Sequence, residues 1–210
     1  MKIFVINLLR SVDRRIFMQK QLDALGLEYE FVEAVEGSAL SEETIASMCD
    51  MEAINKRPKL FSKGAIGCAM SHINIYNRIV DENIDLALIL EDEMVLEKDL
   101  PMIIKEVEKT IQDNEVIMLY FQSKTICELS KVASSKVMKK YTLAYPLDML
   151  QPRCTGAYFV TNTVAKNFSQ NIMPIRVPVD DWDGLYKLGG FATWKRQVRY
   201  KLVIEMACIN

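Results

Sequence analysis

The segment from Leu86 to Leu96, LALILEDEMVL, constrains the fold more than any other part of the chain. Its first five residues are apolar, which is typical of a short β-strand buried on both faces of a sheet. Glu91, Asp92 and Glu93 follow directly, and carboxylates are costly to bury unless they are paired or bind a metal. In an open α/β sheet, ligands bind just outside the carboxyl ends of the strands. The segment therefore indicates either a site for hard cations and hydroxyl groups or a strand that ends in a solvated acidic turn.

Short apolar runs and amphipathic segments alternate along the rest of the chain. We expect strands at residues 3–6, 29–35, 86–90, 116–121, 156–160 and 200–204. We expect helices at residues 14–25, 42–51, 64–80, 100–111, 161–171 and 180–188. Between residues 122 and 149 the pattern weakens and predicts irregular structure or a small hairpin. This alternation predicts an α/β domain with a mostly parallel central sheet flanked by helices.

Bulk composition excludes several classes of protein. The 26 basic and 28 acidic residues nearly balance, so nothing in the charge suggests a nucleic-acid partner. The five cysteines are widely scattered without CxxC spacing, which favours a reducing compartment over a disulfide framework. No apolar run approaches the ~18 residues of a transmembrane helix, and the N-terminus lacks the pattern of a signal peptide. We expect a soluble, cytoplasmic protein and leave contact with a membrane surface open.

A second acidic cluster surrounds Trp182. A carboxylate beside an aromatic ring suits sugar binding or general-base catalysis, but aspartate is also favoured at the N-terminus of a helix. For Asp181 and Asp183 we favour the helix cap. Asp180 follows Pro178 and Val179 at the expected cap position, so it suits either role.

The remaining polar candidates have equally plain structural explanations. His72, the only histidine, lies inside a predicted helix, where a packed and hydrogen-bonded ring is commoner than a ligand. Ser71 precedes it, but no GxSxG motif supports a serine hydrolase. Arg10 and Arg14 follow the first strand and suit either phosphate binding or a solvated helix start. Neither a P-loop nor GxGxxG is present.

Five separate stretches, in this order and spacing, resemble glycosyltransferase family 25. They are Phe4–Leu8 with Asp13–Arg15, Gly64–Cys68 with Ser71–His72, Leu90–Glu93, Thr155–Tyr158 and Pro178–Asp180. This family includes bacterial lipooligosaccharide galactosyltransferases and collagen galactosyltransferase domains. The resemblance covers nearly the whole chain and implies one GT-A-like, Rossmann-like domain over residues 1–210. It further implies a UDP-hexose donor, most often UDP-galactose, and Mn²⁺ or Mg²⁺ as cofactor. The resemblance also implies that the sugar is transferred with inversion. The implied acceptor is an oligosaccharide or lipid-linked intermediate of lipooligosaccharide or lipopolysaccharide biosynthesis, at the inner membrane face.

The resemblance also implies roles for individual residues. Glu93 is expected to bind the metal, and Asp180 is our choice for the base that deprotonates the acceptor hydroxyl. Glu91 and Asp92 are expected to contact the ribose or base of the nucleotide. The remaining residues expected at the nucleotide-sugar site are Asn7, Leu8, Arg10, Arg14, Ser71 and His72.

Two departures from the family pattern keep other functions open. The family usually shows Glu-Asp-Asp, whereas the third acid here is Glu93. Family members also commonly extend further, so we expect a domain shortened at its C-terminus. The alternative is a truncated, non-catalytic relative that binds a nucleotide sugar or a glycan. A weaker alternative is a metal-dependent phosphoryl-transfer or hydrolytic enzyme that uses the same acids.

Overall fold

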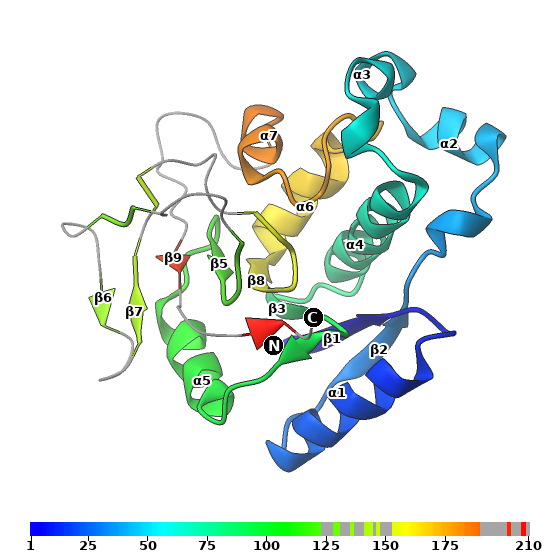
Figure 1. The fold of residues 1–210 in the computed structure, drawn as a ribbon. Coiled ribbons are helices and arrows are strands. Elements are labelled where there is room, and N and C mark those ends of the chain that lie inside the picture. The colour runs from blue at the N-terminus through cyan, green and yellow to red at the C-terminus, as the bar shows by residue number, and fades with distance from the viewer. Residues whose placement is uncertain are drawn as a thin grey trace.

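A computed structural model of the chain contains a central six-stranded sheet with helices on both faces (Figure 1). The structure describes residues 1–122, 128–130, 135–136, 141–144, 146–147, 153–189, 201–202 and 207–208. The strands, in spatial order, are β2 (Glu30–Glu33), β1 (Lys2–Asn7), β3 (Leu86–Glu91), β8 (Ala157–Thr161), β5 (Val116–Met118) and β9 (Lys201–Leu202). Among these described strands, β8 alone runs against the others. The predicted GT-A-like α/β class with a mostly parallel sheet is confirmed.

Helices cover the two faces of the sheet unequally. The helices on one face are α1 (Val12–Ala24) and α5 (Leu100–Thr110). Those on the other face are α2 (Glu42–Met48), α3 (Met51–Lys56), α4 (Lys63–Asp81), α6 (Asn162–Asn171) and α7 (Trp182–Lys187), with the 3₁₀ turns η1 (Gly37–Ala39) and η2 (Pro58–Leu60) nearby in the chain. Two small antiparallel pairs join β4 (Met94–Val95) to β10 (Ala207–Cys208) and β6 (Ser135–Lys136) to β7 (Thr142–Leu143). In the described part of the chain, none of the helices is both long and apolar enough to span a bilayer.

The continuous apolar run of β3 follows from this double cover. Ala87 and Ile89 pack toward α4 and α6, whereas Leu88 and Leu90 pack toward α1 and α5. All four side chains are fully buried, and each of the larger ones contributes roughly 1.5–3 kcal/mol to stability. A one-residue slip of β3 would exchange the two faces, so the packing fixes the position of the acids at its carboxyl end.

The predicted helix over 42–51 is correct to Met48 and wrong at its C-terminal end. Ser41 caps α2, its hydroxyl accepting the Thr44 N–H at 3.0 Å. The helix ends early because Cys49 is extended and forms a β-bridge with Ile175. Asp50 then caps the separate helix α3. A contact with a distant segment of the chain therefore separates α2 from α3, although the local apolar periodicity predicts one continuous helix.

Two predicted helices also begin one or two residues away from the expected position. The helix predicted over 14–25 begins at Val12, so Asp13 lies in its first turn. The cap of α7 is Asp181, which accepts the Gly184 N–H at 3.1 Å, so Asp180 lies outside the helix. The predicted hairpin between residues 122 and 149 is confirmed by β6 and β7, while much of the rest of that stretch lies outside the described residues.

Candidate active site

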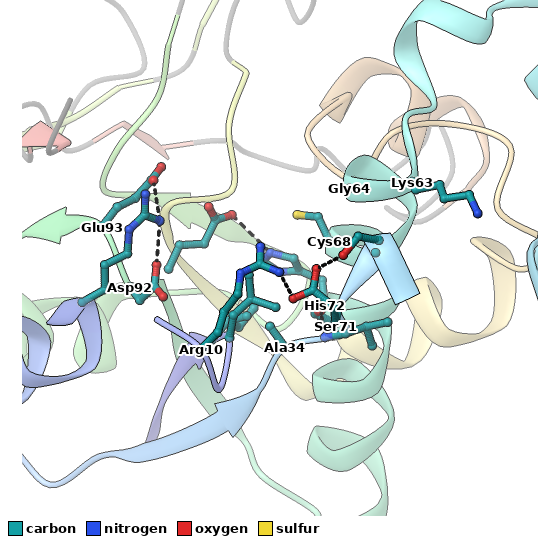
Figure 2. A pocket seen from close by; sticks show the side chains of 17 residues that line it. Arg10, Ala34, Lys63, Gly64, Cys68, Ser71, His72, Asp92 and Glu93 are labelled. Carbon is teal, nitrogen blue, oxygen red and sulfur yellow. Dashed lines mark hydrogen bonds and ion pairs between the residues drawn. The ribbon is translucent and has the colours of Figure 1, made fainter. Parts of the chain in front are cut away.

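A cavity of ≈ 370 Å³ lies at the carboxyl ends of β1 and β3, and 17 residues line it (Figure 2). Asp92 and Glu93 lie on one side, Lys63 and Gly64 on the other, and Arg10 between them. Eight of the predicted site residues line this cavity: Leu8, Arg10, Arg14, Ser71, His72, Glu91, Asp92 and Glu93. The structure thus brings together residues from three separate stretches of the sequence.

Asn7 lies behind the cavity wall and supports Asp92. The parallel register pairs Ile6 with Glu91, which places the next residues of both strands side by side. The Asn7 amide donates to Asp92 Oδ2 at 2.7 Å and to the Ser11 carbonyl at 3.1 Å. Asn7 is only 2% exposed, so it holds the acidic turn in place instead of forming part of the cavity surface.

Arg14 joins the two later acids. Its Nη1 atom lies 3.1 Å from Asp92 Oδ1 and 3.2 Å from Glu93 Oε2. On an extended backbone side chains alternate, which would place Glu91 and Glu93 on one side and Asp92 on the other; the structure does not keep this alternation. The chain leaves the strand at Glu91 and turns, so Asp92 and Glu93 face α1 together while Glu91 faces α4.

Glu91 belongs to a buried polar network on the α4 side. The Thr155 hydroxyl donates to Glu91 Oε1 at 2.6 Å, and His72 Nε2 lies 3.4 Å from the same oxygen. Burial raises the pKa of Glu91, but hydrogen bonds and charge from His72, with help from Thr155, outweigh burial and leave that pKa lowered. Glu91 therefore carries its negative charge at neutral pH.

His72 is held from its other side by tyrosines. Its Nδ1 lies 2.7 Å from the Tyr158 hydroxyl, which lies 2.7 Å from the Tyr76 hydroxyl. The ring is fully buried and stacks on Tyr158 at 5.7 Å between ring centroids. The expectation of a packed, hydrogen-bonded histidine is confirmed, yet its Nε2 edge faces Glu91 at the cavity.

Small residues on α4 let the helix approach the segment that follows β2. A Cβ atom on Gly67 would lie 2.7 Å from the Val35 carbonyl oxygen and 2.8 Å from Gly37 Cα. One turn later, the Ser71 hydroxyl accepts the Val35 N–H at 2.8 Å and donates to the Gly67 carbonyl at 2.7 Å. Ser71 therefore anchors the cavity wall formed by Val35 and Gly37.

Two cations lie around the rim, each engaged with acidic or carbonyl groups. Arg10 pairs with Glu36, and the Ser38 hydroxyl donates to the second Glu36 oxygen at 2.5 Å. Lys63 Nζ lies 2.9 Å from a Glu42 carboxylate oxygen and donates to the Leu40 carbonyl at 2.9 Å. Both side chains are long and exposed, so they can turn toward an anionic ligand.

Asp180 is the one predicted site residue that neither lines the cavity nor supports its wall directly. It lies at the start of the segment that leads into α7, near enough to Glu91 for the two charges to interact. Burial raises the pKa of the Asp180 carboxyl, the nearby Arg153 lowers it in part, and Asp181 and Glu91 raise it further. Arg153 itself pairs with the helix-capping Asp181 at 3.1 Å.

Three residues near Glu91 were given no role from the sequence. Thr155 and Tyr158 belong to the fourth stretch of the family resemblance, but their contacts with Glu91 and His72 depend on β8 lying beside β3. Cys68, which received no role from the sequence, also lines the cavity one helical turn before His72. The spacing of Cys68 and His72 on one helix face was the available signal.

The acidic turn has the donor set that a hard cation requires. Mn²⁺ and Mg²⁺ prefer oxygen ligands and are commonly held by one or two carboxylates plus substrate phosphates. The Glu93 side chain is 29% exposed on the cavity surface, with Asp92 beside it. Glu93 therefore fits a metal that also binds a diphosphate, and the extra methylene of glutamate keeps the same oxygen chemistry.

Comparison with known proteins places this geometry in a family. Residues 1–182 match the sequence model of glycosyltransferase family 25, which is described as LPS biosynthesis protein. The chain belongs to glycosyltransferase family 25. The family predicted from the five sequence stretches is thereby confirmed, and the acidic turn lies within the matched region.

Relatives of this family 25 chain include larger animal proteins. A "Glycosyltransferase 25 family member" from Anopheles gambiae is 39% identical over 101 residues, covering 45% of this chain and 17% of that protein. "Procollagen galactosyltransferase 1" from Danio rerio is 32% identical over 130 residues, covering 56% and 21%. The matched segment thus spans only about a fifth of the length of these relatives. The chain also aligns with a solved structure described as mannose-1-phosphate geranyltransferase from Thermus thermophilus, at 9% identity and a TM-score of 0.44. The alignment covers 98% of this chain and 75% of that one.

Proposed function

We propose that this family 25 chain is a glycosyltransferase that transfers a hexose from a nucleotide-sugar donor to a hydroxyl group of a glycan acceptor. The observation that carries this proposal is the turn Glu91–Glu93 on the wall of a cavity at the carboxyl ends of β1 and β3. UDP-galactose is the donor we favour, because relatives of the chain are named galactosyltransferases.

The donor diphosphate belongs, in this proposal, beside Glu93. Glu93 would hold Mn²⁺ or Mg²⁺, with Asp92 kept in position by Asn7 and Arg14. A divalent cation bound there supplies positive charge that stabilises the departing diphosphate. Arg10 lies on the same wall and can add a second cationic contact to the phosphates.

The nucleoside belongs on the side of Glu91 and Leu8. Glu91 is charged and oriented by Thr155 and His72, so it is prepared to accept hydrogen bonds from ribose hydroxyls. Ser71 uses its only proton within the chain, so its expected part in donor binding becomes a supporting one through the Val35 backbone.

Asp180 is the base in this proposal. Inverting transfer joins the acceptor oxygen to the anomeric carbon as the bond from that carbon to the diphosphate oxygen breaks. The acceptor proton passes to the Asp180 carboxylate. Burial raises the pKa of Asp180, which makes its carboxylate a better proton acceptor than an exposed aspartate. Its position beside the cavity, near the charge of Glu91, suits an acceptor that enters over α7.

An exposed apolar edge supports a lipid-linked acceptor of the lipopolysaccharide type. Leu9, just before α1, is 67% exposed, and Val12 and Ile16 in the first turns of α1 are 54% and 45% exposed. They adjoin Leu8 and Arg14, which line the cavity. Such a patch beside cationic side chains suits the surface of a bilayer that presents the acceptor and would place the enzyme on the inner membrane face.

Donor turnover is the direct test. Purified protein with Mn²⁺ should release UDP from UDP-galactose faster than from UDP-glucose, measured by mass spectrometry. An acceptor panel of lipooligosaccharide core sugars and procollagen peptides then identifies the acceptor. Calorimetric UDP binding with no turnover on any acceptor would instead indicate a nucleotide-sugar-binding protein. Cleavage of simple phosphate esters would indicate a phosphoryl-transfer or hydrolytic enzyme.

A further inference from the structure

Three side chains with different ligand atoms meet on the α4 side of the cavity. Cys68 and His72 lie one helical turn apart on α4, and Glu91 ends β3 opposite them. Their ligand atoms, a sulfur, a ring nitrogen and a carboxylate oxygen, all lie within 4.8 Å of one another. All three residues line the cavity, and Figure 2 shows Cys68 and His72 side by side on the helix.

The spacing of these atoms suits a tetrahedral metal. Zinc binds nitrogen and oxygen at roughly 2.0–2.2 Å and sulfur at about 2.3 Å, so its ligand atoms lie about 3.3–3.6 Å apart. His72 Nε2 and Glu91 Oε1 are already 3.4 Å apart. The Cys68 sulfur lies within 4.8 Å of both atoms, so a shift of at most about 1 Å brings it to the spacing of a tetrahedral site.

The surrounding hydrogen bonds orient the ligands as metal sites require. A metal-binding histidine usually hydrogen-bonds through its second ring nitrogen, which fixes its orientation. His72 Nδ1 has this partner in the Tyr158 hydroxyl at 2.7 Å, in a ring that is fully buried. Thr155 donates to Glu91 Oε1 at 2.6 Å and holds the carboxylate in place. His72 and Glu91 are thus positioned before any metal arrives.

The charge around Cys68 also favours a cation. Burial raises the pKa of the Cys68 thiol far above its usual range, and the carboxylates of Glu91 and Asp180 raise it further. The same negative field that opposes a bare thiolate attracts a dication, and a bound dication replaces the thiol proton. Cys68 therefore suits metal binding better than it suits nucleophilic chemistry.

We propose that Cys68, His72 and Glu91 form a site for a thiophilic dication of the Zn²⁺ class, distinct from the hard-cation position at Glu93. Mixed sulfur, nitrogen and oxygen ligands select Zn²⁺ over Mg²⁺ or Mn²⁺. Three protein ligands leave a fourth position that faces the cavity. Glu91 cannot bind a dication and a ribose at the same time, so Zn²⁺ at this site competes with the nucleotide-sugar donor. This competition rests on the proposed function, whereas the metal site itself does not.

Cobalt substitution tests the site without any enzymatic activity. The intact protein titrated with Co²⁺ should develop the visible bands of tetrahedral cobalt and a thiolate-to-cobalt charge-transfer band, at one ion per chain. Zn²⁺ should abolish both. Cys68→Ser should remove the charge-transfer band, whereas the matched change at the neighbouring Cys154, Cys154→Ser, should retain it. Tyr158→Phe should weaken Co²⁺ binding by about 10- to 100-fold through loss of the contact with His72.

Three results would overturn the proposal. They are absence of the charge-transfer band in the wild type, its survival in Cys68→Ser with unchanged affinity, and its loss in Cys154→Ser. Circular dichroism and thermal melting show whether each variant folds. Glu91→Gln removes the charge of another proposed ligand and should also weaken Co²⁺ binding, so the site can be tested without Cys68→Ser. UDP titrations with and without Zn²⁺ test the competition, which should vanish in Cys68→Ser. Failure of UDP to bind at all would count against the proposed function and would leave the cobalt result unaffected.

Discussion

Gly67 offers a sharp test of how the cavity wall is built. A Cβ atom at this position would meet three backbone atoms at under 3.0 Å: the Val35 carbonyl oxygen, Gly37 Cα and Gly37 N. Backbone atoms cannot rotate away as a flexible side chain can. Gly67→Ala must therefore push α4 away from the segment after β2, or distort that segment.

The expected magnitude follows from two opposing effects. Overpacking a well-packed interior costs about 1–3 kcal/mol, and three backbone contacts place this change in the upper part of that range. Alanine is favoured over glycine within a helix by roughly 0.5–1 kcal/mol. We expect a net loss of about 1.5–2.5 kcal/mol in the free energy of unfolding. For a chain of this size that corresponds to a fall in Tm of about 3–10 °C.

Gly64 supplies the matched control on the same helix. A Cβ at Gly64 would meet only the Ser62 hydroxyl oxygen, at an ordinary 3.7 Å. Gly64→Ala should therefore leave stability unchanged or raise it by up to about 1 kcal/mol. Both variants can be compared by urea unfolding followed by circular dichroism. UDP affinity gives a second readout, and it should fall in Gly67→Ala alone.

Equal stability of the two variants would refute this reasoning. It would show that α4 and the segment at Val35 can separate freely, and that the close approach at Gly67 does not shape the cavity. A destabilised Gly67→Ala with unchanged UDP affinity would separate the two conclusions. It would keep the packing argument and remove Val35 and Gly37 from the donor site.

Three other substitutions test the proposed roles within the site. Glu93→Ala should abolish metal-stimulated turnover of UDP-galactose while the melting temperature stays near that of the wild type; unchanged stimulation would exclude Glu93 as the metal ligand. Asp180→Asn should lower kcat by about 10²- to 10⁴-fold with little change in KM for the donor. Because burial raises the pKa of Asp180 and the base must be deprotonated, wild-type activity should fall with decreasing pH at a higher pH than for an exposed aspartate, and this limb should vanish in Asp180→Asn. By the same shift, the stability of the wild type should decrease relative to Asp180→Asn as the pH rises through the raised pKa. Tyr76→Phe should cost about 0.5–1.5 kcal/mol in urea unfolding, because Tyr158 loses one hydrogen-bond partner.

The fold was largely predictable because the local sequence and the packing agree. The apolar run of β3 specifies a strand covered on both faces, and both core layers are present. Gly67, a residue without a side chain in the predicted helix, is where α4 approaches the segment after β2 most closely among the contacts described above. Because β1 and β3 pair in parallel, the polar residues at their carboxyl ends lie at the same edge of the sheet.

The details of the site depend on contacts between distant segments, which periodicity does not encode. On an extended backbone Glu91 and Glu93 would point the same way, but the chain turns after Glu91 and Glu93 pairs with Arg14. The partner of His72 was hidden because Tyr158 is 86 residues away in the sequence. The division at Cys49 likewise depends on its bridge to Ile175. In each case a tertiary contact overrides the local preference.

The antiparallel direction of β8 has a consequence for how such a site can diversify. Its neighbours β3 and β5 end at the cavity edge, whereas β8 begins there, with Thr155 just before its first residue. The chain therefore enters β8 at the cavity edge, directly after Thr155, and leaves β8 for α6 at the opposite edge of the sheet. Segments exchanged upstream of Thr155 between homologues would alter what surrounds Glu91 while leaving the strand pairings intact. Chimeras joined at Gly156 should therefore exchange specificity and keep the fold.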